Sequence, residues 1–113
     1  MSSFQPACKL ADVRDGGVLA VEVAGLDVAI VRAGDDVYAI QDECSHASIA
    51  LSEGDVDVDA GEIECWLHGS RFDLRTGKPT GPPAYEPVPV YPCQVDGDVI
   101  VVDLANPLTD TEN

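Results

Sequence analysis

Two short cysteine–histidine motifs limit most strictly what this chain can fold into. The motifs are Cys44-Ser45-His46 and Cys65-Trp66-Leu67-His68, with the 18 residues 47–64 between them. The chain has only two histidines and four cysteines, and both histidines fall in these motifs. Thiolates and imidazoles bind zinc and iron–sulfur centres in proteins. The spacing therefore predicts a metal centre that takes one sulfur and one nitrogen ligand from each of two loops, which the fold must bring face to face.

The mixture of ligands within each motif bears on the kind of metal. Structural zinc sites usually take their thiolates from Cys-x2–4-Cys pairs. Here each loop supplies one cysteine and one histidine, which suits a two-iron cluster in which one iron takes both cysteines and the other both histidines. That arrangement needs two neighbouring hairpins whose tips meet. A zinc-stabilised interaction module remains the alternative at this point.

The rest of the sequence predicts an all-β fold. Its apolar runs are short, rich in Val and Ile, and broken by Gly, Asp and Pro. The expected strands are Cys8–Val13, Val18–Val23, Val28–Ala33, Val37–Gln41, Glu62–Cys65, Arg71–Asp73, Val88–Val95 and Val99–Leu104. Gly34-Asp35-Asp36 and Asp96-Gly97-Asp98 are expected to be hairpin turns. Strands at this spacing predict a small antiparallel β-sandwich or barrel.

The segments between the strands carry weaker signals. Residues 47–52 could form one short helical turn, and the acidic stretch Asp55–Gly61 is expected to be an exposed connection. Pro79–Pro92 holds six prolines, so its first half cannot be a central strand. We expect a single domain over residues 1–105 and a frayed polar tail over residues 106–113.

Charge and composition exclude several classes of protein. The 113 residues include 21 acidic and six basic side chains, a net charge of −15, which disfavours nucleic acid as a partner. The acidity favours either a basic surface on another protein or simple solubility. Residues 1–10 do not resemble a secretory signal, and no run of 18 apolar residues is present, so we expect no membrane association. The cysteine spacing favours metal binding over disulfides, and we expect a cytoplasmic, reducing location.

At this point the chain resembles a known family. The pair Cys-x-His and Cys-x-x-His is similar to the motif of Rieske [2Fe–2S] proteins. Gly69 and Phe72-Asp73 match the turn after the second motif, and Pro82-Pro83 resembles the proline loop that covers the cluster. The segment 86–102, EPVPVYPCQVDGDVIVV, is similar to the end of Rieske ferredoxins that serve ring-hydroxylating, biphenyl-type dioxygenases.

The resemblance implies a cofactor and a set of ligands. It implies a [2Fe–2S] cluster with Cys44 and Cys65 on one iron and His46 and His68 on the outer iron. It also implies a cluster-binding part, about residues 42–84, made of two hairpin loops and a proline loop. Two imidazoles in place of two thiolates leave the cluster less negative and raise its reduction potential above that of plant-type ferredoxins.

Four further positions bear on the potential. High-potential Rieske proteins join the two loops by a disulfide, but Ile49 and Leu67 occupy the corresponding positions here. They also place a serine and a tyrosine after the second motif. This chain keeps Ser70, which could equally be an ordinary turn residue, but has Phe72 in place of the tyrosine. These differences predict a low-potential member.

The remaining two cysteines, Cys8 and Cys93, fall in expected strands. We expect them to be small core residues, although the sequence leaves a disulfide between them open.

The resemblance implies an electron carrier rather than an enzyme. Its expected partners, both transient, are a flavin-dependent reductase and a terminal oxygenase. Once the motifs take both histidines, none is left for the two-histidine mononuclear iron of an oxygenase, and no Gly-rich dinucleotide fingerprint is present. Alternative roles are a subunit of a nitrite reductase-type system or an accessory of iron–sulfur assembly.

Overall fold

The fold is a set of short antiparallel strands. The computed structural model describes residues 4–34, 36–43, 50–65, 71–80 and 88–105. Over these residues the strands are β1 (Gln5–Lys9), β2 (Val18–Val23), β3 (Leu26–Ala33), β4 (Asp36–Gln41), β5 (Asp55–Asp57), β6 (Glu62–Glu64), β7 (Arg71–Asp73), β8 (Val90–Tyr91), β9 (Cys93–Asp96) and β10 (Val99–Val102). Two 3₁₀ turns, η1 (Leu10–Asp12) and η2 (Leu51–Glu53), join some of them.

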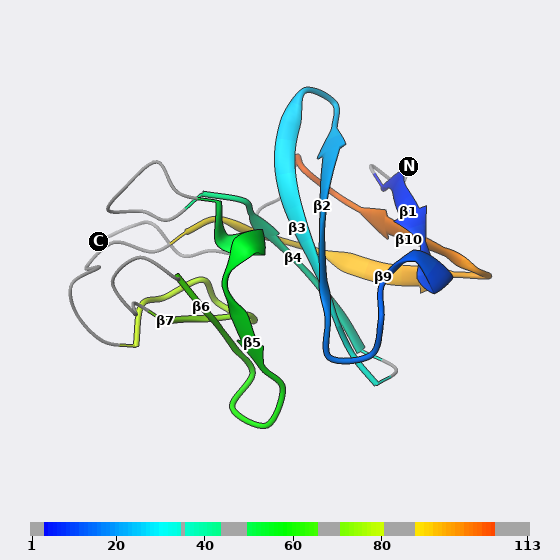
Figure 1. The fold of residues 1–113 in the computed structure, drawn as a ribbon. Helices are drawn as coiled ribbons and strands as arrows, with labels where there is room; N and C mark the ends of the chain where they lie inside the picture. Colours follow the sequence, from blue (N-terminus) through cyan, green and yellow to red (C-terminus); the bar gives the residue numbers. More distant parts are fainter. Residues whose placement is uncertain (1–3, 35, 44–49, 66–70, 81–87, 106–113) are drawn as a thin grey trace.

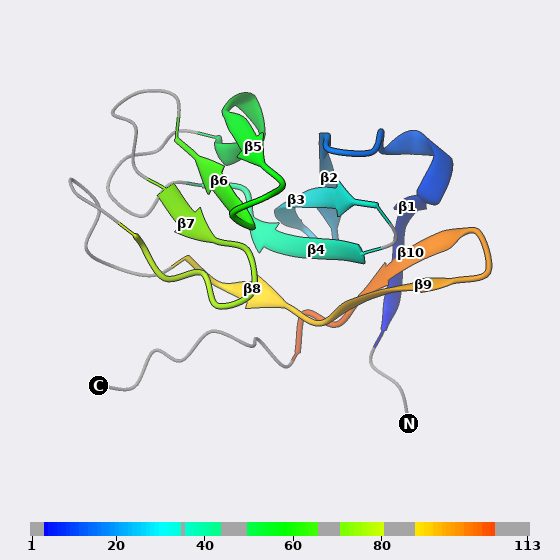
Figure 2. The same ribbon diagram turned by 90° about the horizontal axis from the view of Figure 1, so that it is seen from below.

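The strands form three sheets with antiparallel pairing throughout the described residues. A four-stranded sheet has the order β2-β3-β4-β8, and two three-stranded sheets have the orders β1-β10-β9 and β5-β6-β7. Figure 1 and Figure 2 show the two smaller sheets toward opposite ends of the molecule, with the four-stranded sheet between them. The prediction of a small antiparallel all-β fold is confirmed.

The middle sheet is covered on both faces, and its faces define two cores. The first core contains Ala29, Val31, Ile40, Leu51, Ile63, Cys65, Phe72, Leu74, Val88 and Val90. The second core contains Val13, Val23, Val28, Ile30, Ala39, Tyr91, Ile100 and Val102. Successive residues of a strand point to opposite faces, so the run 28–31 of β3 supplies both cores in alternation. This explains why that run is uninterrupted apolar sequence, as is usual for strands buried on both faces.

The β5–β6–β7 sheet has one apolar and one charged face. Val56 lies against the first core, and Ile63 and Phe72 are fully buried in it. The alternate residues of the same strands are Asp55, Asp57, Glu62, Glu64, Arg71 and Asp73. Because side chains alternate along a strand, these six residues share the outer side of the sheet, which we call the carboxylate face.

Strand β5 corrects one sequence prediction. Asp55–Gly61 was expected to be an exposed connection, but its first three residues pair with β6. Val56 provides the apolar contact that holds the strand against the core, and its two carboxylates point outward. The rest of the segment is a turn, in which the N–H of Gly61 donates to the carbonyl of Asp57 at 2.9 Å.

Pro92 corrects a second prediction. Val88–Val95 was expected to be one strand, but it forms β8 in the middle sheet and β9 in the β1-β10-β9 sheet. Pro92 lies between them and has no N–H for a sheet hydrogen bond, so neither ladder continues through it. Its carbonyl accepts the N–H of Asp103 at 3.0 Å, at the point where the chain passes from one sheet to the other.

The first strand also differs from its prediction, Cys8–Val13. It covers Gln5–Lys9 and gives way to the turn η1, in which the carboxylate of Asp12 accepts the N–H of Lys9 at 3.2 Å. By contrast, β2 and β7 have the predicted bounds, and the predicted turn at Asp96-Gly97-Asp98 joins the paired strands β9 and β10. In the other predicted turn, Asp35 lies outside the described residues and Asp36 already belongs to β4, which pairs with β3. Among the described residues, no helix is long and apolar enough to span a membrane. The predicted tail, residues 106–113, lies outside the described residues.

Candidate metal centre

Of the four predicted ligands, the structure describes Cys65. Cys44, His46 and His68 lie outside the described residues, as do Trp66, Ser70 and the proline pair 82–83. Cys65 directly follows β6, has no exposed surface and carries a free thiol. It packs in the first core with residues such as Leu51 and Phe72. The surroundings of this sulfur are therefore apolar and closed to water.

The segment with the first motif leaves β4 and returns at η2, and the two ends are held together. The carboxylate of Asp42 accepts both the N–H and the hydroxyl of Ser52, each at 2.7 Å. The backbone at this end of β4 is also tied to its neighbours. The N–H of Asp42 donates to the carbonyl of Asp27 at 3.0 Å, and that of Gln41 to the carbonyl of Pro89 at 2.8 Å.

The segment with the second motif leaves β6 and returns at β7, where Glu64 and Arg71 are cross-strand partners. The return from the first motif passes close to this point. A Cβ on Gly54 would lie 1.7 Å from the carbonyl oxygen of Glu64, so only glycine fits there without a shift of the backbone. The ends of the two motif segments are therefore adjacent, as a site built from both motifs requires.

The ends of the proline-rich segment are anchored to the same sheet. The N–H of Thr80 donates to the carbonyl of Arg71 at 2.8 Å, and the N–H of Val88 donates to the carbonyl of Gly77 at 2.8 Å. A Cβ on Gly77 would lie 1.8 Å from the carbonyl oxygen of Val88, and Gly77 has φ +75°. Three chain segments thus begin and end around β6 and β7, at one end of the molecule (Figure 2).

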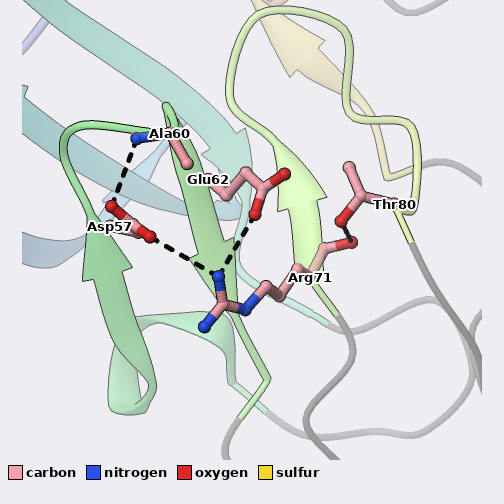
Figure 3. Close-up of polar contacts among 5 residues, drawn as sticks. All are labelled: Asp57, Ala60, Glu62, Arg71 and Thr80. Carbon is pink, nitrogen blue, oxygen red and sulfur yellow. Dashed lines mark hydrogen bonds and ion pairs between the residues drawn. The ribbon is translucent and has the colours of Figure 1, made fainter.

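The carboxylate face lies on the outside of these strands. Its directly opposed pairs include Asp55 with Glu64 and Asp57 with Glu62, and like charges in that position are destabilising. Arg71 partly offsets this repulsion. Its Nη1 lies 3.5 Å from Asp57 Oδ2 and 3.5 Å from Glu62 Oε1 (Figure 3). Among the described residues, no group of three or more Cys, His, Asp or Glu side chains is arranged to hold a metal ion.

Comparison with known proteins identifies the family. Residues 3–92 match the Rieske [2Fe-2S] domain family. The 3-phenylpropionate/cinnamic acid dioxygenase ferredoxin subunit of Shigella boydii is 41% identical over 98 residues, which are 87% of this chain and 91% of that protein. The solved ferredoxin of carbazole 1,9a-dioxygenase from Nocardioides aromaticivorans IC177 is 44% identical, with a TM-score of 0.85, over 89% of this chain and 97% of its own.

A second solved structure includes a partner. It is a complex of reduced oxygenase and oxidized ferredoxin in carbazole 1,9a-dioxygenase. The matching chain of that complex is 29% identical to this chain over the full length of both, with a TM-score of 0.81. With a family match over most of its length and relatives above 40% identity, this chain belongs to the Rieske [2Fe–2S] family. Its cofactor is therefore a [2Fe–2S] cluster, and its role is electron transfer rather than catalysis.

The described residues fit such a cluster. Cys65 is free to supply a thiolate, and its apolar surroundings keep water from the sulfur. Sequence reasoning missed the residues that hold the ends of the three segments together, which are Asp42, Ser52, Gly54 and Gly77. An aspartate two positions before Cys44 was visible in the sequence. Its pairing with Ser52, and the close backbone contacts of the glycines, depend on the path of the folded chain.

Proposed function

We propose that this chain is the ferredoxin component of a ring-hydroxylating dioxygenase system, carrying one electron at a time from a flavin-dependent reductase to a terminal oxygenase. The observation that carries the proposal is the family match, which spans both motifs, together with relatives named as dioxygenase ferredoxins over nearly their whole length. The electron-carrying role follows from the cofactor. The two named partners are the part that needs a direct test.

We assign the ligands as Cys44 and Cys65 on one iron and His46 and His68 on the other. The assignment is supported by the paired motifs and by the burial of Cys65. When bound, the cluster takes up and releases a single electron, at a potential raised by its two neutral imidazoles. The residues around Cys65, among them Leu51, Ile63 and Phe72, exclude water from its sulfur.

The oxygenase is supported as a partner by the solved ferredoxin–oxygenase complex of a related system. The net charge of −15 suits docking onto a basic surface of a partner, because complementary charge speeds the encounter of two proteins.

We also propose the limits and the location of the domain. Residues 1–105 form the Rieske domain, its cluster-binding part covers about residues 42–84, and residues 106–113 form a tail. The limits of the cluster-binding part are supported by the position of β5, β6 and β7 around the ends of the motif segments. The free thiols of Cys8 and Cys93 suit a reducing compartment, so we place the protein in the cytoplasm.

The test is to purify the protein anaerobically and to measure iron, acid-labile sulfide and the resonance spectrum of the reduced form. A Rieske cluster gives a coloured protein whose average g is below that of four-cysteine clusters. The loaded protein is then mixed with a flavin-dependent reductase, NADH and a terminal oxygenase. Reduction of the oxygenase only when this chain is present supports the proposal. A colourless protein with a single tetrahedral zinc ion, or a loaded protein that neither partner recognises, would refute it.

A further inference from the structure

We propose that Asp42 is a positioning residue for the metal centre: its carboxylate fixes the two ends of the segment that carries Cys44 and His46. The inference rests on the ligand set proposed above. It concerns two residues that lie wholly within the described chain, Asp42 and Ser52.

The geometry of the contact is specific. Asp42 follows the last residue of β4, and both of its carboxylate oxygens are used on one residue ten positions further along the chain. Oδ1 accepts the backbone N–H of Ser52 at 2.7 Å, and Oδ2 accepts the Ser52 hydroxyl at 2.7 Å. Hydrogen bonds to an ionised carboxylate are roughly twice as strong as those between neutral groups. A two-point contact also fixes orientation, which a single bond does not.

The partner of Asp42 is itself tied to the position of Cys65. Ser52 lies in η2 beside Leu51, which is fully buried in the same core as Cys65. The turn ends at Gly54, whose N–H donates to the carbonyl of Leu51 at 3.0 Å and whose backbone passes close to Glu64. A chain of contacts therefore runs from Asp42 through η2 to the residue before Cys65. By holding Ser52, Asp42 fixes the end of β4 relative to the second motif.

The contact also shortens the span that the first motif must close. Without it, the segment would be anchored by β4 on one side and by the packing of Leu51 on the other. With the contact, the two ends of the segment are already held together. Less conformational entropy is then lost when Cys44 and His46 bind the cluster. Mutation of residues that support metal ligands commonly lowers metal affinity about 10- to 100-fold. We expect the loss of Asp42 to weaken cluster retention by a factor of that order.

The same hairpin provides a matched control. At its other end, Asp15 Oδ1 accepts the N–H of Gly34 at 2.7 Å, also across a long sequence separation. Gly34 directly follows β3 in the hairpin turn, whereas Asp42 directly follows the last residue of β4, at the opposite end of the hairpin. Along β4 the two contacts are roughly 25 Å apart. Asp15→Ala therefore removes a carboxylate–backbone bond of equal length from the same sheet, far from the motif.

The experiment uses the cluster-loaded protein and the variants Asp42→Ala, Asp42→Asn, Ser52→Ala and Asp15→Ala. For each we would measure the rate of iron loss to a chelator, the resonance spectrum of the reduced cluster and the melting temperature. We expect Asp42→Ala to lose iron at least about 10-fold faster than wild type and to give a broadened spectrum. Ser52→Ala, which loses one of the two bonds, should be intermediate. Asp42→Asn can keep both contacts through its amide, but as neutral hydrogen bonds, so it should rescue part of the effect, and Asp15→Ala should match wild type.

Two results would overturn the proposal. One is that Asp42→Ala keeps the wild-type rate and spectrum. The other is that the rate of iron loss rises in the same proportion to the fall in melting temperature for Asp42→Ala as for Asp15→Ala. Asp42 would then stabilise the fold in general and have no specific role at the metal centre. If Asp42→Ala does not accumulate, Ser52→Ala decides between these outcomes. A wild-type protein without iron would instead refute the ligand set, so the two failures are distinguishable.

Discussion

Phe72 lies in the same buried core as Cys65, with no exposed surface. We predict that Phe72→Tyr raises the reduction potential, because a hydroxyl that donates to a ligand sulfur stabilises the more negative reduced cluster. A hydrogen bond stronger by about 1 kcal/mol in the reduced state corresponds to about 40 mV for one electron. Protein-film voltammetry measures the shift, with Phe72→Leu as the apolar control. An unchanged potential with a lowered free energy of unfolding would mean that the new hydroxyl is buried without a partner.

Cys8 and Cys93 are free thiols that pack half-buried against the second core, where small buried core residues were expected. Burial, with a smaller contribution from nearby Cys8, raises the pKa of Cys93 to about 12. Burial, and then the charge of Asp12, also raise the pKa of Cys8.

These raised pKa values predict a fall in stability at high pH. The native state keeps the Cys93 proton to a higher pH than the unfolded state, so this contribution is complete below the ordinary thiol pKa near 9 and is lost up to about pH 12. We expect Cys93→Ser to reduce the fall in unfolding free energy over this window by up to about 1.4 kcal/mol per pH unit. Urea unfolding at a series of pH values measures this fall. Equal slopes for wild type and variant would contradict it.

At the scale of the elements, two glycines in turns allow a comparison between the cost of a left-handed backbone conformation and the cost of a steric clash with the backbone. Gly77 and Gly97 have φ values of +75° and +69°, but only Gly77 would bring a Cβ against a backbone atom, the carbonyl oxygen of Val88. We predict that Gly97→Ala costs about 1–2 kcal/mol, the usual cost of the left-handed conformation, and that Gly77→Ala costs more. Denaturant unfolding gives both values. The collision would be disproved by equal losses of stability.

The strands show what sequence patterns can and cannot predict. Val18–Val23 and Arg71–Asp73 were predicted with their observed bounds, because alternation and flanking turn residues mark both. The strand Asp55–Asp57 was missed because two of its three residues are acidic, and only the position of Val56 against the core explains it. Pro92 was visible in the sequence, but its effect, a change of sheet, depends on which strands lie on either side.

The candidate site divides in the same way. The motifs named all four ligands directly, and this assignment stays a prediction for Cys44, His46 and His68, which lie outside the described residues. The contacts that frame the site could not be predicted, because Asp42 and Ser52 meet only when β4 and η2 are in place. Motifs report the chemistry of a centre, whereas its support comes from tertiary structure.

For the whole molecule, the dominant property is its charge. A groove lies along the carboxylate face, beside the strands that flank the second motif. Its lining has five carboxylates against one cation, Arg71, with two valines: Asp55, Val56, Asp57, Val58, Asp59, Glu62, Glu64 and Arg71. If a basic partner docks near the cluster, attraction to this face should speed association. The effect should weaken with salt, because the Debye length falls from about 30 Å at 0.01 M to about 3 Å at 1 M.

We therefore predict that the second-order rate of oxygenase reduction falls at least about 10-fold over that range of salt. Stopped-flow absorbance measures the rate. Asp55→Asn should slow the reaction at low salt more than Asp36→Asn, which removes the same charge from the exposed start of β4. A rate that does not respond to salt would rule out steering by charge. Equal effects of the two variants would rule out a special role for the carboxylate face.

The two-sided burial of the middle sheet limits how this electron carrier could be re-engineered. Half of the first core, namely Ala29, Val31, Ile40, Val88 and Val90, comes from outside residues 42–84. A peptide of residues 42–84 transplanted into another scaffold would lack half of the residues that bury the apolar side of β6 and β7. The smallest transferable module must bring β3, β4 and β8 along, and their opposite side would then need a new cover in the host.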